Sequence, residues 1–344
     1  MNPHFLSPGN VRSSVADPVI GFAFGSGGSN GTLFRRNRPA ALGFALVVAA
    51  TSLAPIARAD LLVLNAAGSV SYIQRLDTTS GAPLGVFRHD TEAYYTMTLS
   101  PWNELCVASN ILGEHTLQGF EPDGRYRGDL ARNVLTGLDG GMRGPDGAIY
   151  AIGREDTFSA AGEVSSVLRI DQQGAKRWVP HGAGGMTAPV TLAFSPAGDL
   201  YVGDAKAGVL RFDGATGAAR GVVVLLGQDR LPDVAKLLFG TDGRLYVASS
   251  QLNAVLRFDA DSGASAGPWV TSGSGGLVRP AGMAFGPDGH FYVTSTGTNQ
   301  ILRYDGATGA PLGVLATAPA AAGDPRVRWR DIVFTDSIRS EGME

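Results

Sequence analysis

Residues Gly282 to Leu315 have the sequence GMAFGPDGHFYVTSTGTNQILRYDGATGAPLGVL. Apolar residues alternate with small ones at its start, and Gly286 to Gly289 has the composition of a tight turn whose last glycine can adopt a positive φ. A second turn, Asp305 to Gly309, follows a run rich in branched and aromatic residues. The stretch therefore predicts four short strands in an antiparallel meander, a unit that cannot bury both of its faces alone.

Imperfect copies of this stretch fill most of the chain. The segment FGPDGHFYV, which begins at Phe285, recurs as FSPAGDLYV from Phe194 and as FGTDGRLYV from Phe239. One second-strand position recurs at intervals of 44, 44, 51, 45 and 46 residues: Leu62, Cys106, Tyr150, Tyr201, Tyr246 and Tyr292. A period near 45 residues with four strands per unit is typical of a β-propeller, and six copies predict six blades of four antiparallel strands.

The two ends of the repeat region predict how the ring closes. Residues 60–63 match the second strand of the other copies, so the first copy lacks a first strand. Residues 331–335 have the pattern of that missing strand, with Phe334 at the position of Phe285. We expect this segment to pair with the strand at Leu61, which leaves no inner edge open to pairing with other chains.

The chain before the repeats divides into two parts. Residues 1–34 are polar and rich in glycine and serine, and we interpret them as disordered or as the product of a start codon assigned too early. Residues 35–59 combine arginines, an apolar run and Ala57-Arg58-Ala59, the order of a secretory signal peptide. As a membrane anchor the apolar run is short, because a span needs about 20 residues. We expect a propeller over residues 60–336, a tail over 337–344, and a periplasmic or secreted location.

Charge and cysteine content limit the partners. Removal of residues 1–59, which hold five arginines and one aspartate, leaves 23 basic against 30 acidic residues, a net charge of −7. This balance, without a basic run, argues against a nucleic acid partner. The single cysteine, Cys106, excludes an internal disulfide and is expected to be a buried apolar residue. We expect a monomer without a membrane span after signal cleavage.

The units resemble NHL repeats. In that family a turn with Asp-Gly precedes an LYVAD-like strand, and an asparagine precedes the third strand; DGRLYVASSQLNAVLRFD from Asp242 and DGHFYVTSTGTNQILRYD from Asp288 match this pattern. The resemblance covers nearly the whole repeat region and implies the propeller fold. It leaves the activity open, because similar six-bladed propellers include protein-interaction scaffolds, streptogramin-type lyases and gluconolactonase-like proteins.

Residues repeated in the blades are interpreted as structural. Arginine occupies one third-strand position in five copies: Arg75, Arg169, Arg211, Arg257 and Arg303. Aspartate begins the following turn: Asp77, Asp171, Asp213, Asp259 and Asp305. We expect the arginines to pack their aliphatic stems and pair with carboxylates, and the aspartates to accept hydrogen bonds from local backbone amides.

Function is expected where one copy departs from the others, on the face that carries the loops between second and third strands and between successive blades. The candidate ligand-binding residues are Arg143, Arg154, Glu155, Asp156, Asp204, Asp233 and Arg279. Arg143 stands where other copies have phenylalanine, so either the strand shifts in register and Met142 fills the gap, or Arg143 points into the channel to bind an anion. Gly153 to Ser165 is the longest inter-strand loop, a candidate lid or recognition loop.

The candidates for metal ligands are Glu114, His115, Asp139 and His181. A metal centre requires three or four converging donors, and spacing across blades does not establish convergence. Glu114 and His115, placed on an exposed loop, equally fit a solvated surface pair. No cofactor is evident from motifs, since the chain has no nucleophile elbow, Walker loop, HExxH or Cys-x-x-Cys.

The sequence favours an exported module that binds a protein, peptide or glycan through the loop-bearing face. The alternative is a metal-dependent lyase or lactonase-type enzyme with its site at the mouth of the central channel, where Ca²⁺ or Zn²⁺ would polarise a carbonyl or activate water. The first strands carry no repeated set of ligands for such a metal, which lowers the enzyme alternative. A purely structural envelope component is a third interpretation and predicts no discrete pocket.

Overall fold

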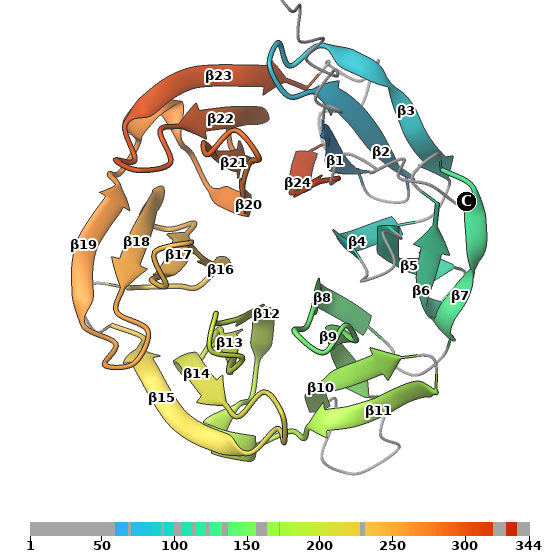
Figure 1. The fold of residues 1–344 in the computed structure, drawn as a ribbon, viewed down its shortest axis with the longest axis vertical. Helices are drawn as coiled ribbons and strands as arrows, with labels where there is room; N and C mark the ends of the chain where they lie inside the picture. Colours follow the sequence, from blue (N-terminus) through green and yellow to red (C-terminus); the bar gives the residue numbers. More distant parts are fainter. Residues whose placement is uncertain are drawn as a thin grey trace, which may run out of the picture. The chain divides into compact units, whose positions relative to one another are not determined.

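The computed structural model describes residues 59–335, apart from 68–69, 91–92, 100–104, 112–113, 122–123, 133–136, 156–163, 172, 228–230 and 319–327. The described residues belong to one unit, Leu53–Glu344. They form six four-stranded antiparallel sheets arranged in a ring (Figure 1), which confirms the six-bladed β-propeller. Residues 1–58 of the expected leader and the whole expected tail, residues 337–344, lie outside the described residues. None of the described helices is both long and apolar enough to cross a membrane.

Each blade contributes four strands, which follow one another from the axis of the ring outwards. Blade 1 contains β24 (Arg328–Phe334), β1 (Asp60–Ala67), β2 (Val70–Asp77) and β3 (Pro83–Asp90). Blade 2 contains β4 (Ala93–Leu99), β5 (Leu105–Ile111), β6 (Glu114–Phe120) and β7 (Tyr126–Arg132). Blade 3 contains β8 (Gly137–Arg143), β9 (Ile149–Glu155), β10 (Val164–Asp171) and β11 (Gly174–Val179).

The second half of the ring repeats this arrangement. Blade 4 contains β12 (Pro189–Phe194), β13 (Leu200–Asp204), β14 (Gly208–Phe212) and β15 (Ala219–Leu225). Blade 5 contains β16 (Lys236–Phe239), β17 (Leu245–Ser249), β18 (Ala254–Phe258) and β19 (Ser265–Val270). Blade 6 contains β20 (Pro280–Phe285), β21 (Phe291–Ser295), β22 (Gln300–Tyr304) and β23 (Pro311–Thr317).

The ring closes through the C-terminal strand, as predicted. Strand β24 pairs antiparallel with β1, so that Phe334 lies opposite Leu61 and Ile332 opposite Val63. Trp329 of the same strand is buried, and its backbone N–H donates to the Asn299 side chain of blade 6 at 3.1 Å. The first blade is therefore assembled from both ends of the described chain.

The hydrophobic core is divided among the blade interfaces. Among the described residues, six clusters of buried apolar side chains form, one between each pair of adjacent blades. At four interfaces a first-strand phenylalanine packs its ring edge-on against a second-strand tyrosine of the preceding blade, with centroids 4.7–5.6 Å apart: Phe194–Tyr150, Phe239–Tyr201, Phe285–Tyr246 and Phe334–Tyr292. Such contacts lock neighbouring blades together.

The interface between blades 2 and 3 departs from this pattern. Arg143 occupies the phenylalanine position, since it pairs with Ile149 as Phe194 pairs with Leu200. The tyrosine position facing it is occupied by Cys106, which is buried as predicted. The expected shift in register at Arg143 is therefore wrong, although Met142 does pack against the adjoining apolar clusters. The pairing extends to Arg143, the last residue of β8, because the backbone ladder is independent of the side chain.

The repeated polar residues have structural roles. Three blade arginines pair with carboxylates, as predicted: Arg75 with Asp60, Arg169 with Asp146, and Arg211 with Asp199. In the described part of the chain Arg257 and Arg303 make no ion pair, and each has a buried Nε atom without a hydrogen-bond partner, so the predicted pairing with carboxylates does not extend to them. The five turn aspartates accept backbone N–H bonds from residues two or three positions ahead, which confirms their predicted role.

The outer strand of every blade contains one glycine with positive φ. These glycines are Gly85, Gly128, Gly174, Gly221, Gly267 and Gly313, with φ from 81° to 143°. A β-carbon would meet no atom within 4 Å at any of them, so the backbone conformation and not crowding requires glycine. The pairing of these strands with their neighbours is irregular next to most of the glycines, and such bulges discourage edge-to-edge association of exposed strands.

Candidate functional site

A cavity of about 200 Å³ lies at one end of the central channel. Inner strands of all six blades contribute to its wall. The lining residues that carry the argument are Thr96, Thr191, Lys236, Arg279, Arg330 and Asp331. Ser250 and Thr296, which follow the second strands of blades 5 and 6, also line it. The cavity therefore opens on the face that carries the loops between second and third strands, as the sequence predicts for a binding site.

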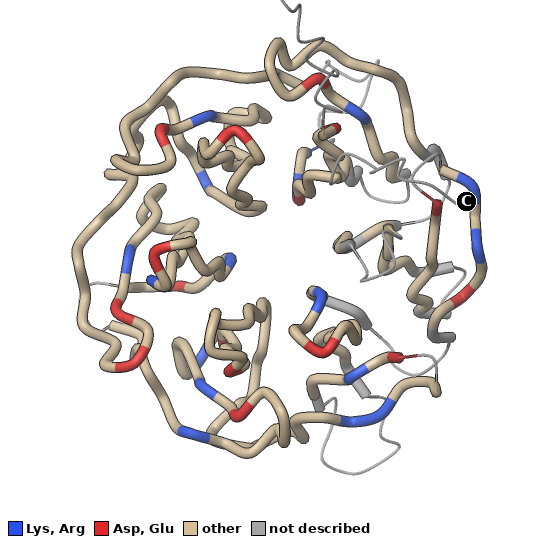
Figure 2. Tube along the Cα trace, viewed as in Figure 1, with Lys and Arg blue, Asp and Glu red and all other residues tan. Residues whose placement is uncertain are grey.

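The strand register places equivalent residues of four blades around the cavity. Thr96, Thr191, Lys236 and Asp331 each lie opposite the same second-strand position of their own blades. Two of these positions are charged, and Figure 2 shows the charged positions on the inner ends of β16 and β24 near the axis. The residue type therefore varies between blades at a first-strand position that faces the channel.

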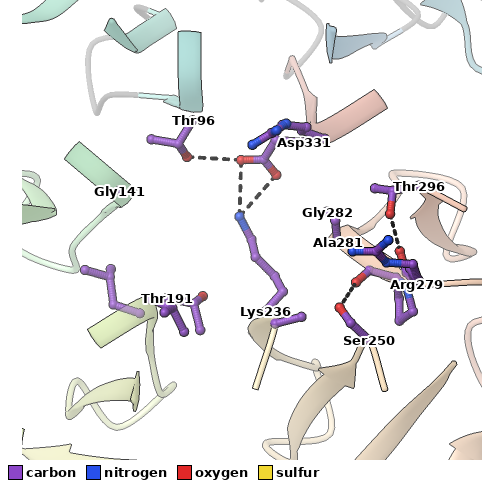
Figure 3. Close-up of a pocket in the computed structure, with 15 residues that line it drawn as sticks. Thr96, Gly141, Thr191, Lys236, Ser250, Arg279, Ala281, Gly282, Thr296 and Asp331 are labelled. Atoms are coloured by element: carbon purple, nitrogen blue, oxygen red, sulfur yellow. Dashed lines mark hydrogen bonds and ion pairs between the residues drawn. The ribbon is translucent and has the colours of Figure 1, made fainter. Parts of the chain in front are cut away.

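One ion pair crosses the channel. The Lys236 ammonium lies 3.1 and 3.2 Å from the two carboxylate oxygens of Asp331, and the Thr96 hydroxyl donates to the same carboxylate at 3.1 Å (Figure 3). These residues belong to blades 5, 1 and 2. The Asp331 side chain is 8% exposed and that of Lys236 is 26% exposed. Because a buried carboxylate needs compensating partners, both contacts help to hold the Asp331 side chain within the wall.

A bulge in β24 places Arg330 beside this pair. The pairing with β1 passes from Asp331 opposite Leu64 to Trp329 opposite Asn65, so Arg330 is the extra residue of the strand. Its side chain is exposed and lines the cavity. Bulges commonly redirect a side chain at the rim of a sheet, and here the bulge turns a cation to the mouth of the channel.

Arg279 is held at the mouth by its backbone. It has φ 53°, an unusual value for a residue with a side chain. Its N–H donates to Asn253 at 2.8 Å, and its carbonyl accepts the Thr296 hydroxyl at 2.7 Å (Figure 3). These contacts fix the strained backbone and leave the guanidinium out of the local network.

The two mouth arginines differ from three of the five blade arginines. Within the described part of the chain, no ion pair or side-chain hydrogen bond involves the guanidinium of Arg279 or Arg330, whereas Arg75, Arg169 and Arg211 are paired with carboxylates. A second cavity of about 330 Å³ shares both mouth arginines and adds Arg328 to the wall. The mouth is therefore rich in cationic donors.

The hydroxyl groups of the wall already have partners. Thr96 donates to Asp331, Ser250 donates to the Pro280 carbonyl at 3.1 Å, and Thr296 donates to the Arg279 carbonyl. The Thr191 hydroxyl accepts from the Leu237 N–H at 3.3 Å. The donors left for a ligand are then mainly the arginine guanidinium groups, which favour oxyanions as acceptors.

Two of the predicted binding residues, Asp204 and Asp233, are engaged with the backbone of loops. Asp204 is fully buried and accepts four backbone N–H bonds, from Thr187, Ala188, Lys206 and Ala207, at 2.6–2.9 Å. Asp233 accepts the N–H groups of Ser250 and Gln251 and the Ser249 hydroxyl. Both carboxylates bind loops that surround the mouth, and neither lines the cavity.

Arg143, another predicted binding residue, lies away from the cavity. Arg143 is exposed at the end of β8 opposite to the mouth. Arg154 and Glu155 belong to the end of β9, opposite Ser165 and Val164 of β10, so the hairpin extends further into the expected loop than predicted. Asp156 lies outside the described residues. Of the predicted binding residues whose side chains the structure describes, only Arg279 lines the cavity.

Of the four metal candidates, only His181 has a described side chain. Glu114 and His115 begin β6 instead of lying on a loop, because the hairpin pairing continues to Ile111 opposite Glu114. Asp139 lies in β8 at a register shift, and the side chains of these three are outside the described part. His181 is exposed on the loop after β11. Among the residues whose side chains are described, no three His, Cys, Asp or Glu groups could bind one metal ion.

The donor set at the cavity does not suit a divalent cation. Its one acidic side chain among the described wall residues, Asp331, is already paired with Lys236, and two arginines stand beside it. Hard cations such as Ca²⁺ prefer several oxygen ligands, and neighbouring positive charges oppose them. The described wall residues therefore do not fit the metal that the enzyme alternative implies.

The sequence analysis missed Lys236, Arg330 and Asp331. Lys236 begins the segment KLLF and Asp331 begins DIVF, so both have the sequence pattern of an ordinary first strand. Alignment of the blades at this position, where the other described copies have threonine or glycine, would have identified both as departures from the repeat.

Comparison with known proteins shows the fold. No family model and no curated protein matches the sequence. A nidogen/laminin complex structure matches with a TM-score of 0.63 and 16% identity, over 81% of this chain and 99% of that one. A protein of unknown function from Bacteroides caccae matches with a TM-score of 0.55 and 12% sequence identity, over 81% of this chain and 99% of that one. A gluconolactonase from Xanthomonas campestris matches with a TM-score of 0.51 and 17% sequence identity, over 71% of this chain and 90% of that one. The protein shares the six-bladed β-propeller with such structures.

Proposed function

We propose that this chain is an exported binding module that captures its ligand at the loop-bearing mouth of the central channel. The observation that carries the proposal is the cavity of about 200 Å³ whose wall contains residues of all six blades. A site built on paired strands is held rigidly, so a ligand finds its contacts already in place. The resemblance to NHL repeats, a family that includes protein-interaction scaffolds, supports the same interpretation.

The ligand class that fits this mouth is a peptide, protein segment or glycan that inserts one group into the channel. The cavity is too small for more than a terminal group, and the adjoining cavity of about 330 Å³ extends the contact surface outward. The proposed export rests on the leader-like sequence of residues 35–59. N-terminal sequencing of the protein recovered outside the cytoplasm tests this part of the proposal.

A blocking substitution tests the proposed site. Ala281 lines both cavities, and Ala281→Trp is expected to fill the mouth. Ala307→Trp, on an exposed turn between β22 and β23, is the matched control. We expect saturation-transfer NMR with envelope-derived peptides and glycan fragments to find ligands that bind the wild type and the control and not Ala281→Trp.

The same experiment separates the binding module from an enzyme, because the recovered ligands can be analysed after incubation. Unchanged ligands support the proposal, and chemical conversion that Ala281→Trp abolishes supports a lyase or lactonase-type enzyme. Equal binding by the wild type and Ala281→Trp contradicts the proposed site.

A further inference from the structure

We infer that the group inserted into the mouth is an oxyanion, recognised by Arg279 and Arg330, and that Asp331 competes with it as an internal carboxylate. The inference deepens the proposed function and rests on it for the place of binding. Carboxylate, phosphate and sulfate groups share the chemistry that matters at this mouth, which is a negative charge spread over oxygen acceptors.

The first argument is the state of the arginines. In the described structure the guanidinium groups of Arg279 and Arg330 have no anionic partner, while the blade arginines Arg75, Arg169 and Arg211 are paired. Arginine binds planar oxyanions through two parallel N–H bonds. Two such groups at one cavity form an anion site.

The second argument is the backbone geometry that presents these side chains. Arg279 adopts φ 53° and Arg330 is the extra residue of a bulge, and both departures from regular strand geometry direct the side chain to the cavity. Strained backbone is retained where the surroundings fix it, and at Arg279 the strained residue lines the cavity.

The third argument is the ion pair in the wall. Lys236 is the third cation of the cavity, and its ammonium nitrogen is paired with a carboxylate oxygen of Asp331 at 3.1 Å. The Asp331 carboxylate thus takes the place that a ligand carboxylate would take, and it repels an incoming anion. Removal of its charge frees the ammonium and raises the local positive potential.

Calorimetry with two defined probes tests the inference. Inorganic phosphate and malonate are titrated at low ionic strength into the wild-type protein and into Arg279→Gln, Arg330→Gln and Asp331→Asn. Arg244→Gln is the control, because Arg244 is exposed beside Asp242 on the turn between β16 and β17. We expect each mouth Arg→Gln change to weaken binding by about tenfold, a typical effect of losing a charge-assisted contact. We expect Arg244→Gln to leave it unchanged.

The most diagnostic variant is Asp331→Asn. We expect it to strengthen anion binding by about tenfold, because a like charge leaves the site while the side chain keeps its shape. Arg330→Lys, which keeps the positive charge, is expected to retain part of the affinity and controls for folding. Malonate binding without phosphate binding assigns the site to carboxylate-bearing ligands, and the reverse result assigns it to phosphorylated or sulfated ones.

The failures of the inference and of the proposed function are distinguishable. Unchanged anion binding in both Arg→Gln variants, or weaker binding in folded Asp331→Asn, overturns the inference. A neutral ligand that Ala281→Trp blocks and that Arg330→Gln still binds overturns the inference and leaves the proposed function standing. Anion binding as expected, with no larger ligand blocked by Ala281→Trp, supports the inference and contradicts the proposed function.

Discussion

The ring depends on a strand that comes from the far end of the chain, and one substitution measures this dependence. Ile332 of β24 is 3% exposed and lies opposite Val63. Leu192 of β12 is 5% exposed and lies opposite Val202, the same position in blade 4. We predict that Ile332→Ala and Leu192→Ala destabilise the protein by similar amounts, because both side chains fill the interface at the same depth.

The magnitude follows from the buried surface. Each change removes three carbon atoms from a closed interface, worth about 0.8 kcal/mol each, and the cavity left behind adds to this. The free energy of unfolding should fall by about 2–4 kcal/mol in both variants. For a protein of this size each kcal/mol lowers the melting temperature by roughly 2–4 °C.

Urea denaturation followed by circular dichroism provides the measurement, with the slope of the transition compared among variants. Val86→Ala is the control, because Val86 is 55% exposed on β3 and its truncation should leave stability nearly unchanged. A cost below about 0.5 kcal/mol for Ile332→Ala, beside a cost above about 2 kcal/mol for Leu192→Ala, would refute the account of ring closure.

Three further predictions concern buried polar groups and strand geometry. Asp204→Asn should lower the free energy of unfolding by about 1.5–3 kcal/mol, because the carboxylate accepts four backbone N–H bonds. Urea denaturation should show a much smaller loss for Asp213→Asn, which changes an aspartate on an exposed turn. Equal losses in the two variants contradict this role of Asp204. Gly313→Ala should cost roughly 1–3 kcal/mol because φ is 105°, and thermal unfolding as stable as that of the wild type contradicts this. Burial raises the pKa of Tyr150 and of Tyr201 to about 12, whereas tyrosines of the unfolded chain titrate near 10. The native state therefore binds these phenolic protons more tightly, so their contribution to stability is complete below about pH 10 and is lost between about pH 10 and 12. Tyrosinate absorbance should rise together with the loss of circular dichroism, and ionisation of these tyrosines near pH 10 in the intact fold contradicts the prediction.

The fold was predictable because its determinants are local and repeated. Each turn carries its own Asp-Gly chemistry, and the interval between copies counts the blades without knowledge of long-range contacts. Closure by residues 331–335 followed from the pattern of one missing strand. The extent of the hairpins was less predictable, since β6 and β9 include Glu114 and Arg154 that side-chain polarity assigned to loops.

The site was predictable only in its face and in one residue, Arg279. Its wall takes residues from six blades, and no local motif marks residues that lie far apart in the chain. Asp204 shows the opposite error: an unrepeated aspartate on a loop looked like a ligand-binding group, and its four backbone contacts give it a structural role that polarity alone does not reveal.

The most direct test of the central claim is a crystal structure of the protein grown with selenate, an oxyanion that anomalous scattering locates without ambiguity. The account predicts an anomalous peak at the channel mouth, within hydrogen-bonding distance of the guanidinium groups of Arg279 and Arg330. Selenate bound elsewhere on the surface, with no peak at the mouth, would contradict it.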